Sequence, residues 1–265
     1  LYSVLCFGIP ESPRWLIAHG GQREAGKEVF RKINPDLSEP EVQQLVDSVA
    51  ASVGDRATAA KFFTARLRVP ILLAILIAAF NQLSGINAIL YFAPRLLGLA
   101  GISDPLSASI GIGVTNLVFT FVGLWLIDKL GRRTLLYIGS VGYIVSLGLC
   151  SWAFHTEAFA IVPICIFAFI AAHAVGQGAV IWVLISEIFP NRNRAAGQSL
   201  GSFTHWFFAA SLTLVFPKMA EAMAPATIFG FFCFMMVLQL IWVKTMVPET
   251  KGVPLEQMHK RLAGG

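Results

Sequence analysis

The chain has 265 residues, of which 56% are hydrophobic and only 13% are charged. Soluble globular domains carry about 25% charged residues, so this composition excludes an ordinary water-soluble enzyme. The net charge of +5 could suit a nucleic acid, but the placement of the basic residues indicates a membrane topology and no nucleic-acid partner.

Six long stretches of the sequence contain no Asp, Glu, Lys or Arg. They are 22 to 29 residues long and cover 69–94, 105–127, 134–156, 158–186, 195–217 and 222–243. A helix needs about 20 apolar residues to cross a bilayer, and the strands of a membrane barrel would give alternating segments of about 10 residues instead. The sequence therefore predicts an all-α membrane protein with a six-helix transmembrane bundle over 69–247, whose last span reaches about residue 247.

The basic residues alternate between the two sides of these spans. Loops on one side hold 18 Lys and Arg residues, and loops on the other hold two, Arg95 and Lys218. By the positive-inside rule, the side with 18 faces the cytoplasm. Both ends of the chain and the tail at 248–265 are therefore expected in the cytoplasm, and the protein in the plasma or inner membrane.

The N-terminal part of the chain has two sections. Residues 1–9 are apolar but too short to span, and we expect the end of a truncated transmembrane helix there, in a chain that is a fragment or the second half of a longer protein. Residues 10–68 form the only sizeable polar part. They are predicted to form a cytoplasmic linker of short amphipathic helices.

Within this linker, the sequence predicts one helix that opens at Pro13 and ends at Asn34-Pro35, with Ala25, Val29 and Ile33 on one stripe. A second helix is expected from Ser38, where Ser38 and Glu41 match a capping box. Its apolar stripe is formed by Val42, Leu45, Val46 and Val49.

The first span carries the most informative polar residues. Asn81, Gln82, Ser84 and Asn87 fall within seven residues, followed by Tyr91. Amides are costly in hydrocarbon unless they face a polar cavity or partner helices. On a regular helix Gln82 and Asn87 would point about 140° apart, so we expect a distortion at Ser84-Gly85 that turns both toward one cavity. Hydrogen bonding between helices alone is the competing interpretation.

The later spans contain fewer polar groups. These are Asn116 in the second span, His173 and Gln177 in the fourth, beside Trp182, and His205-Trp206 in the fifth. Trp182 and Trp206 could stack on the C–H face of a sugar or could only pack. The two histidines are interpreted first as packing residues rather than as proton carriers. The cysteines have no CxxC or other metal-ligand spacing, and neither a metal nor a cofactor is expected.

Charged residues of both signs gather where spans meet the cytoplasmic side. They are Asp128 to Arg133, Glu187 to Arg194, and Glu249. The positive-inside rule explains the arginines but not the acids. These residues are therefore predicted to form a breakable network of ion pairs that holds the helix ends together in one conformation.

Taken together, the motifs resemble the sugar porter family of the major facilitator superfamily. They are PESPRWL at 10–16, NQLSGINAILYFAP at 81–94, DKLGRR at 128–133, SEIFP at 186–190 and PETKG at 248–252. The resemblance covers essentially the whole chain. It implies a fold of twelve helices in two halves, of which this chain is the cytoplasmic helical linker and the C-terminal six-helix half.

The resemblance also implies roles for particular residues. By position, Gln82, Asn87 and Asn116 match residues that bind sugar hydroxyls, Trp182 matches a tryptophan near the sugar ring, and Tyr91, with Phe92 beside it, matches an aromatic gate. Asn81, His173, Gln177, His205 and Trp206 complete the expected substrate site. The expected charge network comprises Glu11, Arg14, Asp128, Arg132, Arg133, Glu187, Arg194 and Glu249.

Some positions depart from the family pattern. Asn81 stands where a second glutamine is usual, and the segment 176–182 lacks the prolines often found there. These departures affect which sugar is carried, a hexose or a pentose, and not the class.

The leading prediction is transport of a monosaccharide by alternating access. No HExxH and no Cys/His metal-ligand set occurs in the spans, which disfavours a membrane enzyme. A non-transporting sugar sensor of the same fold is the alternative. None of the six spans contains an acidic residue, and in the family the coupling acid, where present, lies in the first half, so proton symport and facilitated diffusion both stay open.

Overall fold

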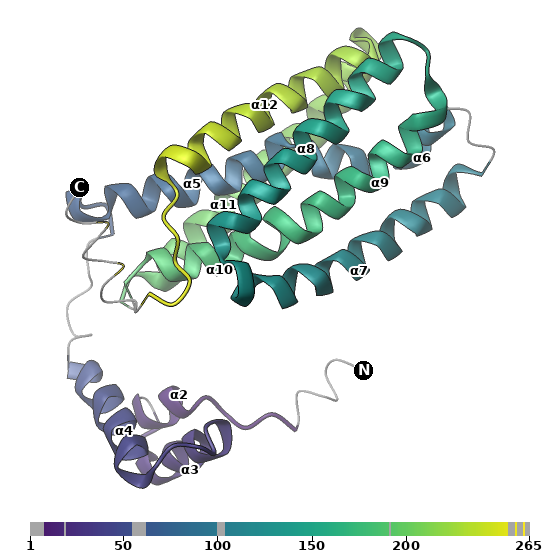
Figure 1. Cartoon of the computed structure of the whole chain (residues 1–265). Coiled ribbons are helices and arrows are strands. Elements are labelled where there is room, and N and C mark those ends of the chain that lie inside the picture. The colour runs from purple at the N-terminus through teal and green to yellow at the C-terminus, as the bar shows by residue number, and fades with distance from the viewer. Residues whose placement is uncertain are drawn as a thin grey trace. The chain divides into compact units, whose positions relative to one another are not determined.

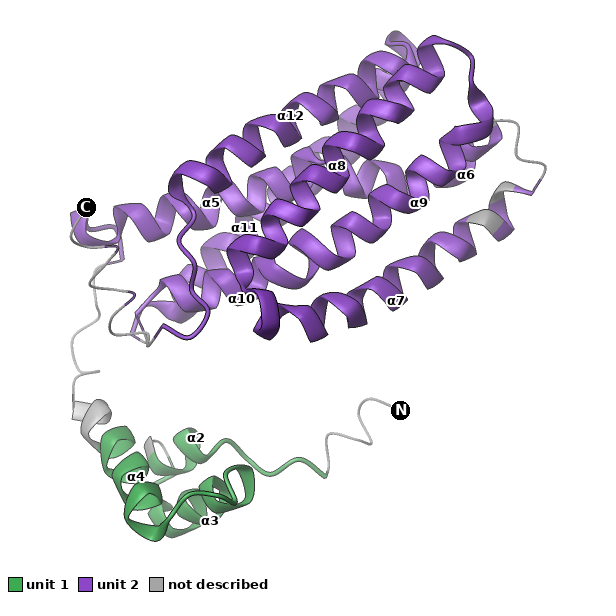
Figure 2. Ribbon diagram, in the orientation of Figure 1, with its two compact units in different colours: residues 1–61 green, residues 62–265 purple. Residues whose placement is uncertain are grey.

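The chain is described from a computed structural model, which defines residues 8–18, 20–54, 62–99, 104–190 and 192–253, together with Met258 and Leu262. The chain divides into two compact units, 1–61 and 62–265 (Figure 1, Figure 2). The helix end expected at 1–9 lies almost entirely outside the described residues.

The first unit contains α2 (Pro13–Ala18), α3 (Arg23–Ile33) and α4 (Glu39–Gly54). They enclose a small apolar core of Ile17, Phe30, Val42, Val46 and Val49. The three valines confirm the stripe predicted for α4. The stripe predicted for α3 is wrong at Ile33, which is 59% exposed, because the buried face of α3 is formed by Gly26, Val29 and Phe30.

The predicted first helix and the predicted capping box of this unit are each confirmed only in part. The single helix expected from Pro13 is interrupted by a turn in which Gly21 has a φ of +62°, a conformation that glycine adopts at little cost. At the start of α4, Glu41 accepts the backbone N–H of Ser38 at 2.7 Å, as predicted. The Ser38 hydroxyl, however, donates to the same carboxylate oxygen rather than accepting from the helix.

Ion pairs join α3 to the start of α4. Glu39 lies 2.5 Å from both the Lys27 ammonium and the Arg31 guanidinium. Hydrogen bonds from Arg31, first, and Lys27 hold the pKa of Glu39 at about 2, below its ordinary value of 4.5. Arg23 and Asp47 form a further pair at 2.8 Å. Because all of these groups except the partly buried Lys27 are exposed, each pair contributes little on its own.

The second unit is a bundle of long helices (Figure 1). In chain order they are α5 (Arg68–Leu83), α6 (Ile86–Leu99), α7 (Pro105–Leu130), α8 (Arg132–His155), α9 (Val162–His173), α10 (Ala179–Ile188), α11 (Arg194–Ala222) and α12 (Pro225–Met246). Short 3-10 turns, η2 (Ala65–Leu67) and η3 (Phe159–Ile161), precede α5 and α9. A π-helical turn, η4 (Ala174–Gly178), joins α9 to α10.

Six of the resulting helical segments are long and apolar enough to cross a membrane, which confirms the predicted all-helical, six-span class. The last span begins at Pro225 rather than at residue 222, because residue 222 is the end of α11. Proline suits the first helical position, since its missing N–H would have no partner there.

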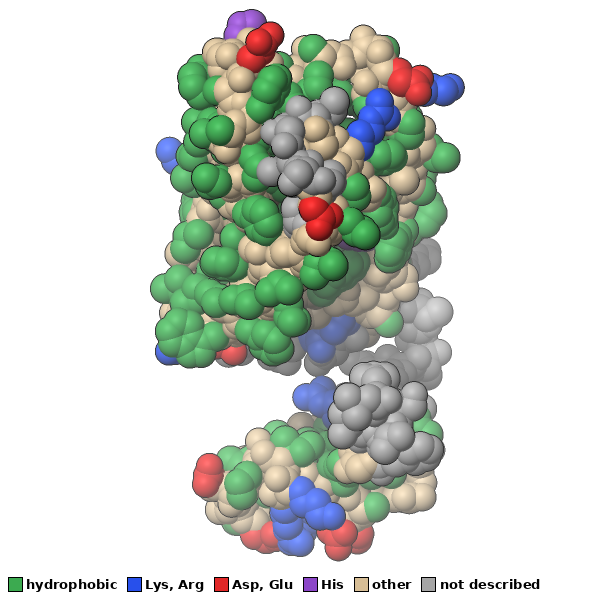
Figure 3. Space-filling view, turned by 90° about the vertical axis from the view of Figure 1, so that its right-hand side faces the viewer, with side chains coloured by type: hydrophobic (Ala, Val, Ile, Leu, Met, Phe, Trp, Pro, Cys, Tyr) green, Lys and Arg blue, Asp and Glu red, His purple; other side chains and the backbone are tan. Residues whose placement is uncertain are grey.

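The bundle has two apolar cores, one toward each end of the helices. The first includes Tyr143, Phe169 and Phe232, and the second includes Leu73, Leu184 and Trp242. Hydrophobic side chains also cover much of the outside (Figure 3), and α7 is the extreme case, with only 17% of its apolar window buried. Such an outer surface is expected where lipid or other membrane helices take the place of water.

Candidate functional site

The first span is broken between α5 and α6. Gly85 has a φ of +84°, and a Cβ added there would lie 2.6 Å from the Phe232 ring, so only glycine fits. The Ser84 hydroxyl donates to the carbonyl of Asn81 at 2.6 Å and accepts the N–H of Ile86 at 3.3 Å. These bonds satisfy backbone groups released by the break, which lies at the predicted position.

The break brings a cluster of neutral polar side chains together. The Gln82 amide donates to Asn81 Oδ1 at 3.0 Å, and its oxygen accepts from Asn87 Nδ2 at 2.8 Å. Its nitrogen also contacts His205 on α11. Gln82 and Asn87 therefore meet directly, as expected from a distorted helix and not from a regular one. Neutral amides both donate and accept, which suits sugar hydroxyls without a buried charge.

His205 has an unusual geometry relative to Gln82. The Gln82 Nε2 atom lies 3.2 Å from both ring nitrogens. An imidazole lone pair lies in the plane of the ring, and a donor in that plane could not reach both nitrogens without colliding with the carbon between them. The amide therefore lies over the face of the ring as an N–H···π contact. The in-plane positions of both nitrogens are left to other partners.

Two tryptophans flank the same histidine. The ring centroid of Trp182 on α10 lies 5.2 Å from that of His205, and the Trp206 centroid lies 5.3 Å away. Trp206 is 63% exposed and Trp182 37% exposed, so neither is enclosed as a core packing residue. Together with the buried Gln82 and the half-buried Asn87 they form a cluster of amide and aromatic groups from α5, α6, α10 and α11.

The other expected site residues are placed differently. His173 Nδ1 bonds the Tyr143 hydroxyl at 2.5 Å, an anchor that the sequence pattern did not reveal. Gln177 in η4 is fully buried, and its amide has no hydrogen-bond partner among the described residues. Asn116 on α7 is half-buried. Within the described part of the chain, no hydrogen bond links these three side chains to the Gln82 cluster.

The predicted gate residues lie on α6, just after the break. Tyr91 is 59% exposed. Phe92 is half-buried and packs against Phe216, with ring centroids 4.8 Å apart. Only Tyr91 therefore presents its ring to the outside of the bundle.

At one end of the bundle, charged groups connect the ends of α7, α8 and α10. Arg132 makes two bonds to Glu187, at 2.8 and 3.1 Å, and a third to Asp128 at 3.2 Å. A two-point arginine–carboxylate pair is the strongest ion-pair geometry available to side chains. The pair ties the start of α8 to the end of α10.

Glu249 caps the N-terminus of α8. Its carboxylate accepts the backbone N–H groups of Arg132 and Arg133 at 3.0 and 3.1 Å, and also those of Thr250 and Lys251 at 2.9 Å each. Gly131 makes this possible, because its φ is +89° and an added Cβ would lie 2.5 Å from the carboxylate.

Some network members differ from the expectation. The Arg133 side chain donates to the carbonyl of Lys244 at 2.7 Å rather than to an acid. Thr250 was not anticipated, yet its hydroxyl donates to Glu187 at 2.6 Å; its position directly after Glu249 was the available signal. Arg194 opens α11. Glu11 and Arg14 belong to the first unit, whereas the network lies in the second unit. Their expected part in the network therefore stays a prediction.

A six-span helical bundle with a broken first span, a neutral polar cluster at the break and a charge network at one end has the architecture of a membrane transporter. Residues 1–262 match the family model described as "Sugar (and other) transporter". The chain belongs to this family of the major facilitator superfamily.

Individual relatives agree. The chain is 30% identical to the arabinose-proton symporter of Bacillus subtilis, with 98% of this chain and 56% of the relative covered. It is 33% identical to the D-xylose-proton symporter of Escherichia coli, with 98% and 54% covered. It is 30% identical to the facilitated glucose transporter member 3 of Canis lupus familiaris, with 96% and 53% covered. The chain thus spans about half the length of the relatives it matches.

Solved structures give the same fold. The proton:xylose symporter XylE bound to 6-bromo-6-deoxy-D-glucose is similar with a TM-score of 0.82 at 30% identity, over 98% of this chain and 56% of that one. The inward-open conformation of the E. coli xylose transporter gives a TM-score of 0.71, over 97% and 53%.

Proposed function

We propose that the chain is the linker and second six-helix half of a transporter that moves a monosaccharide, a hexose or a pentose, by alternating access. The carrying observation is the Gln82–Asn87–His205 cluster at the break of the first span. It offers several neutral hydrogen-bonding groups beside two aromatic faces, the combination that a sugar ring requires. Transport rather than enzyme catalysis or sensing is favoured because the relatives named above are transporters.

The proposed sugar site contains Gln82, Asn87, Asn81, His205, Trp182 and Trp206, with Asn116, His173 and Gln177 as further members that would approach in the complete protein. In the structure the amide groups bind one another. A sugar hydroxyl would replace these mutual contacts one for one, so binding would leave no buried polar group without a partner.

The charge network is proposed as a gate at the cytoplasmic end. With Glu187 and Glu249 bonded to the start of α8, the ends of α8, α10 and α12 are held together. Opening the transporter on this side would require these bonds to break. The Arg132–Glu187 pair is part-buried. When it breaks, both charged groups regain hydration by water, and this offsets much of the free energy of the lost ion pair. The loss of an apolar contact has no such compensation.

The proposed topology places both ends of the chain in the cytoplasm, in a plasma or inner membrane, with a preceding six-helix half as the obligate partner. Whether sugar transport is coupled to proton movement can be decided by an uptake assay. Uptake of labelled sugar into proteoliposomes that is driven by an imposed proton gradient indicates symport, whereas uptake that follows the sugar gradient alone indicates facilitated diffusion.

The sugar site is tested in the full-length transporter by Gln82→Ala. Loss of two sugar hydrogen bonds, each worth about 0.5–1.5 kcal/mol, should weaken sugar binding about 5- to 150-fold. Gln239→Ala is the matched control, because Gln239 is a buried membrane glutamine that bonds Ser140 at 2.9 Å outside the cluster. It should lower stability and leave the binding constant unchanged. Unchanged sugar binding in Gln82→Ala would refute the site, and binding without flux would refute transport.

A further inference from the structure

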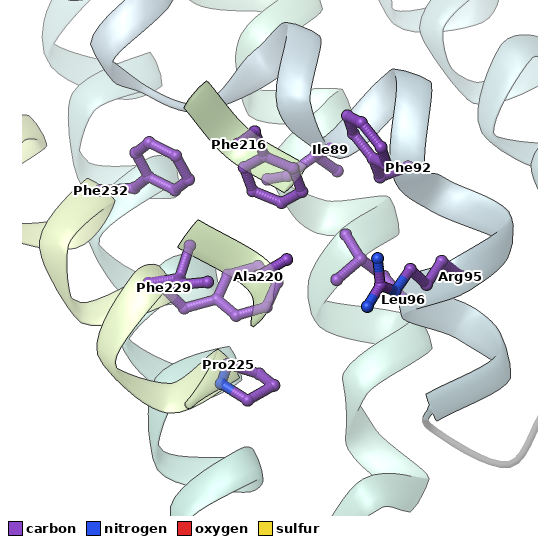
Figure 4. Close-up of a pocket in the computed structure, with 10 residues that line it drawn as sticks. Ile89, Phe92, Arg95, Leu96, Phe216, Ala220, Pro225, Phe229 and Phe232 are labelled. Carbon is purple, nitrogen blue, oxygen red and sulfur yellow. The ribbon is translucent and has the colours of Figure 1, made fainter. Parts of the chain in front are cut away.

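A second site lies among α6, α11 and α12. Figure 4 shows a pocket there whose walls are almost entirely apolar, with the rings of Phe92, Phe216, Phe229 and Phe232 around it. The enclosed cavity is small, about 30 Å³, and it continues into open space at the surface of the bundle. Of the described residues that line it, only Arg95 is charged.

The pocket lies at the end of the bundle opposite the charge network. Arg95 is one turn before the end of α6 at Leu99, and Pro225 in the pocket wall is the first residue of α12. The network, by contrast, surrounds the start of α8 and the residues after α12. In a helix that just spans the bilayer, terminal turns lie at the level of the lipid headgroups, and the turns below them lie among acyl chains.

The charge of Arg95 is available at this mouth. The side chain is exposed, and among the described residues no Asp or Glu forms an ion pair with it. Figure 4 shows its guanidinium turned toward the space between α6 and α12. The N-terminus of α12 adds the positive end of a helix dipole beside the same opening.

These features select a particular kind of ligand. The aromatic and aliphatic wall has no groups for sugar hydroxyls, so a sugar would lose its hydrogen bonds to water without replacement. A hydrocarbon chain suits the wall, and a phosphate suits a guanidinium that can donate two parallel N–H bonds. Among molecules found at this depth, a phospholipid with a net negative charge offers both.

We infer that this pocket binds one acyl chain of an anionic phospholipid, with the lipid phosphate at Arg95. Since four of the lining residues belong to α6, the lipid would pack against the half-span that follows the break at Ser84-Gly85. A bound lipid would therefore stabilise the arrangement of α6 that leaves the pocket open.

Native mass spectrometry of the full-length transporter tests the inference. The detergent-purified protein is incubated with phosphatidylglycerol, with phosphatidylcholine of the same acyl chains, or with oleate, and retained molecules are counted. One lost cationic contact near the membrane surface is worth about 1 kcal/mol, so Arg95→Gln should lower phosphatidylglycerol retention about fivefold. Ala220→Leu, which fills the pocket and keeps Arg95, should lower it as well.

Lys218→Gln is the control, because Lys218 is a basic residue at the same end of the bundle that does not line the pocket. It should retain phosphatidylglycerol as the wild type does. Equal retention of phosphatidylcholine and phosphatidylglycerol would overturn the inference, as would wild-type retention by Arg95→Gln. Displacement of phosphatidylglycerol by equimolar oleate would overturn the assignment to a phospholipid. Because Arg95 is exposed, its substitution should not disturb folding, and thermal unfolding in lipid-free detergent checks both variants.

Discussion

Glu249 offers the sharpest test of how the charged end of the bundle is held. Its carboxylate accepts four backbone N–H groups, and the two oxygens share them unequally. Oε1 accepts from Arg132, Thr250 and Lys251, and Oε2 accepts from Arg133. Glu249→Ala removes both acceptor oxygens and thus all four hydrogen bonds, whereas Glu249→Gln can keep the three bonds at Oε1 and loses the charge.

The size of the effect follows from these contacts. Loss of a helix N-cap costs about 0.5–2 kcal/mol, and loss of a negative charge at a helix N-terminus about 0.3–1 kcal/mol. Two further N–H groups lose their acceptor, although the one on Lys251 is exposed and can bind water. Glu249→Ala should therefore destabilise the protein by about 2–4 kcal/mol. Glu249→Gln should cost about 1 kcal/mol, mainly from the dipole interaction.

Chemical denaturation of the full-length protein in detergent measures these differences. Gly131→Ala is an independent perturbation of the same cap, since its Cβ would displace the carboxylate. It should destabilise the protein at least as much as Glu249→Ala, because the φ of +89° adds backbone strain to any other residue. Glu221→Ala, an exposed acid at the opposite end of the bundle, is the control and should be neutral. Equal stabilities of the glutamine and alanine variants of Glu249 would show that the hydrogen bonds to Oε1 contribute nothing, and the capping argument would fail.

Three other predictions concern separate parts of the chain. Gly85→Ala should destabilise the protein by about 2–5 kcal/mol through positive φ and overlap with Phe232. Gly113→Ala, in the interior of α7 with open space around it, should be neutral or stabilise by up to about 1 kcal/mol in the same denaturation assay, because alanine is the better helix former. Similar destabilisation by both variants would contradict a strained break. Arg132→Gln and Glu187→Gln should each raise the reactivity of single cysteines placed on the network side of α8. Arg23→Gln, which breaks an exposed pair in the first unit, should leave that reactivity unchanged. Wild-type reactivity in both network variants would count against a gate. Because the pKa of Glu39 is lowered to about 2, its stabilising contribution is present above pH 4.5 and is lost as the pH falls toward 2. Pepsin cleavage within α3 and α4 of the wild type should thus accelerate between pH 4.5 and 2. Glu39→Gln should already be cleaved faster than the wild type at pH 4.5, and Glu28→Gln should follow the wild type. If Glu39→Gln gave the same profile as the wild type, the ion pairs of Glu39 would not be what stabilises this unit.

Most of the fold could be predicted from the positions of the long uncharged stretches in the sequence. Burial in a membrane requires long uncharged helices, so the six spans and their class were predictable. Local interruptions were harder. At the π-turn over 174–178, Gly176 packs closely against Gly139 on α8, and the sequence alone does not reveal that contact. The turn at Gly21 and the exposure of Ile33 likewise depend on which face α2 covers.

The candidate site was predictable in its position and less so in its contacts. Four polar residues within seven in an apolar span indicated both the break and the meeting of Gln82 with Asn87. The approach of His205 depends on α11 packing along α5, which periodicity does not reveal. Tyr143 as the partner of His173, and Thr250 as a partner of Glu187, arise from contacts across 30 and 63 residues of sequence. Such pairings are properties of the tertiary structure.

The cap on α8 also bears on how the chain matures. The bond from Arg132 to Glu249 closes across 117 residues, so during synthesis the start of α8 must enter the membrane with its N–H groups bound to water or to other partners. Only after α12 has been made and inserted can the residues that follow it return to α8. The charged end of the bundle is therefore completed last. A chain stopped after α12 but before Glu249 would contain all six spans without the contact that fastens the first residues of α8 to the segment after α12.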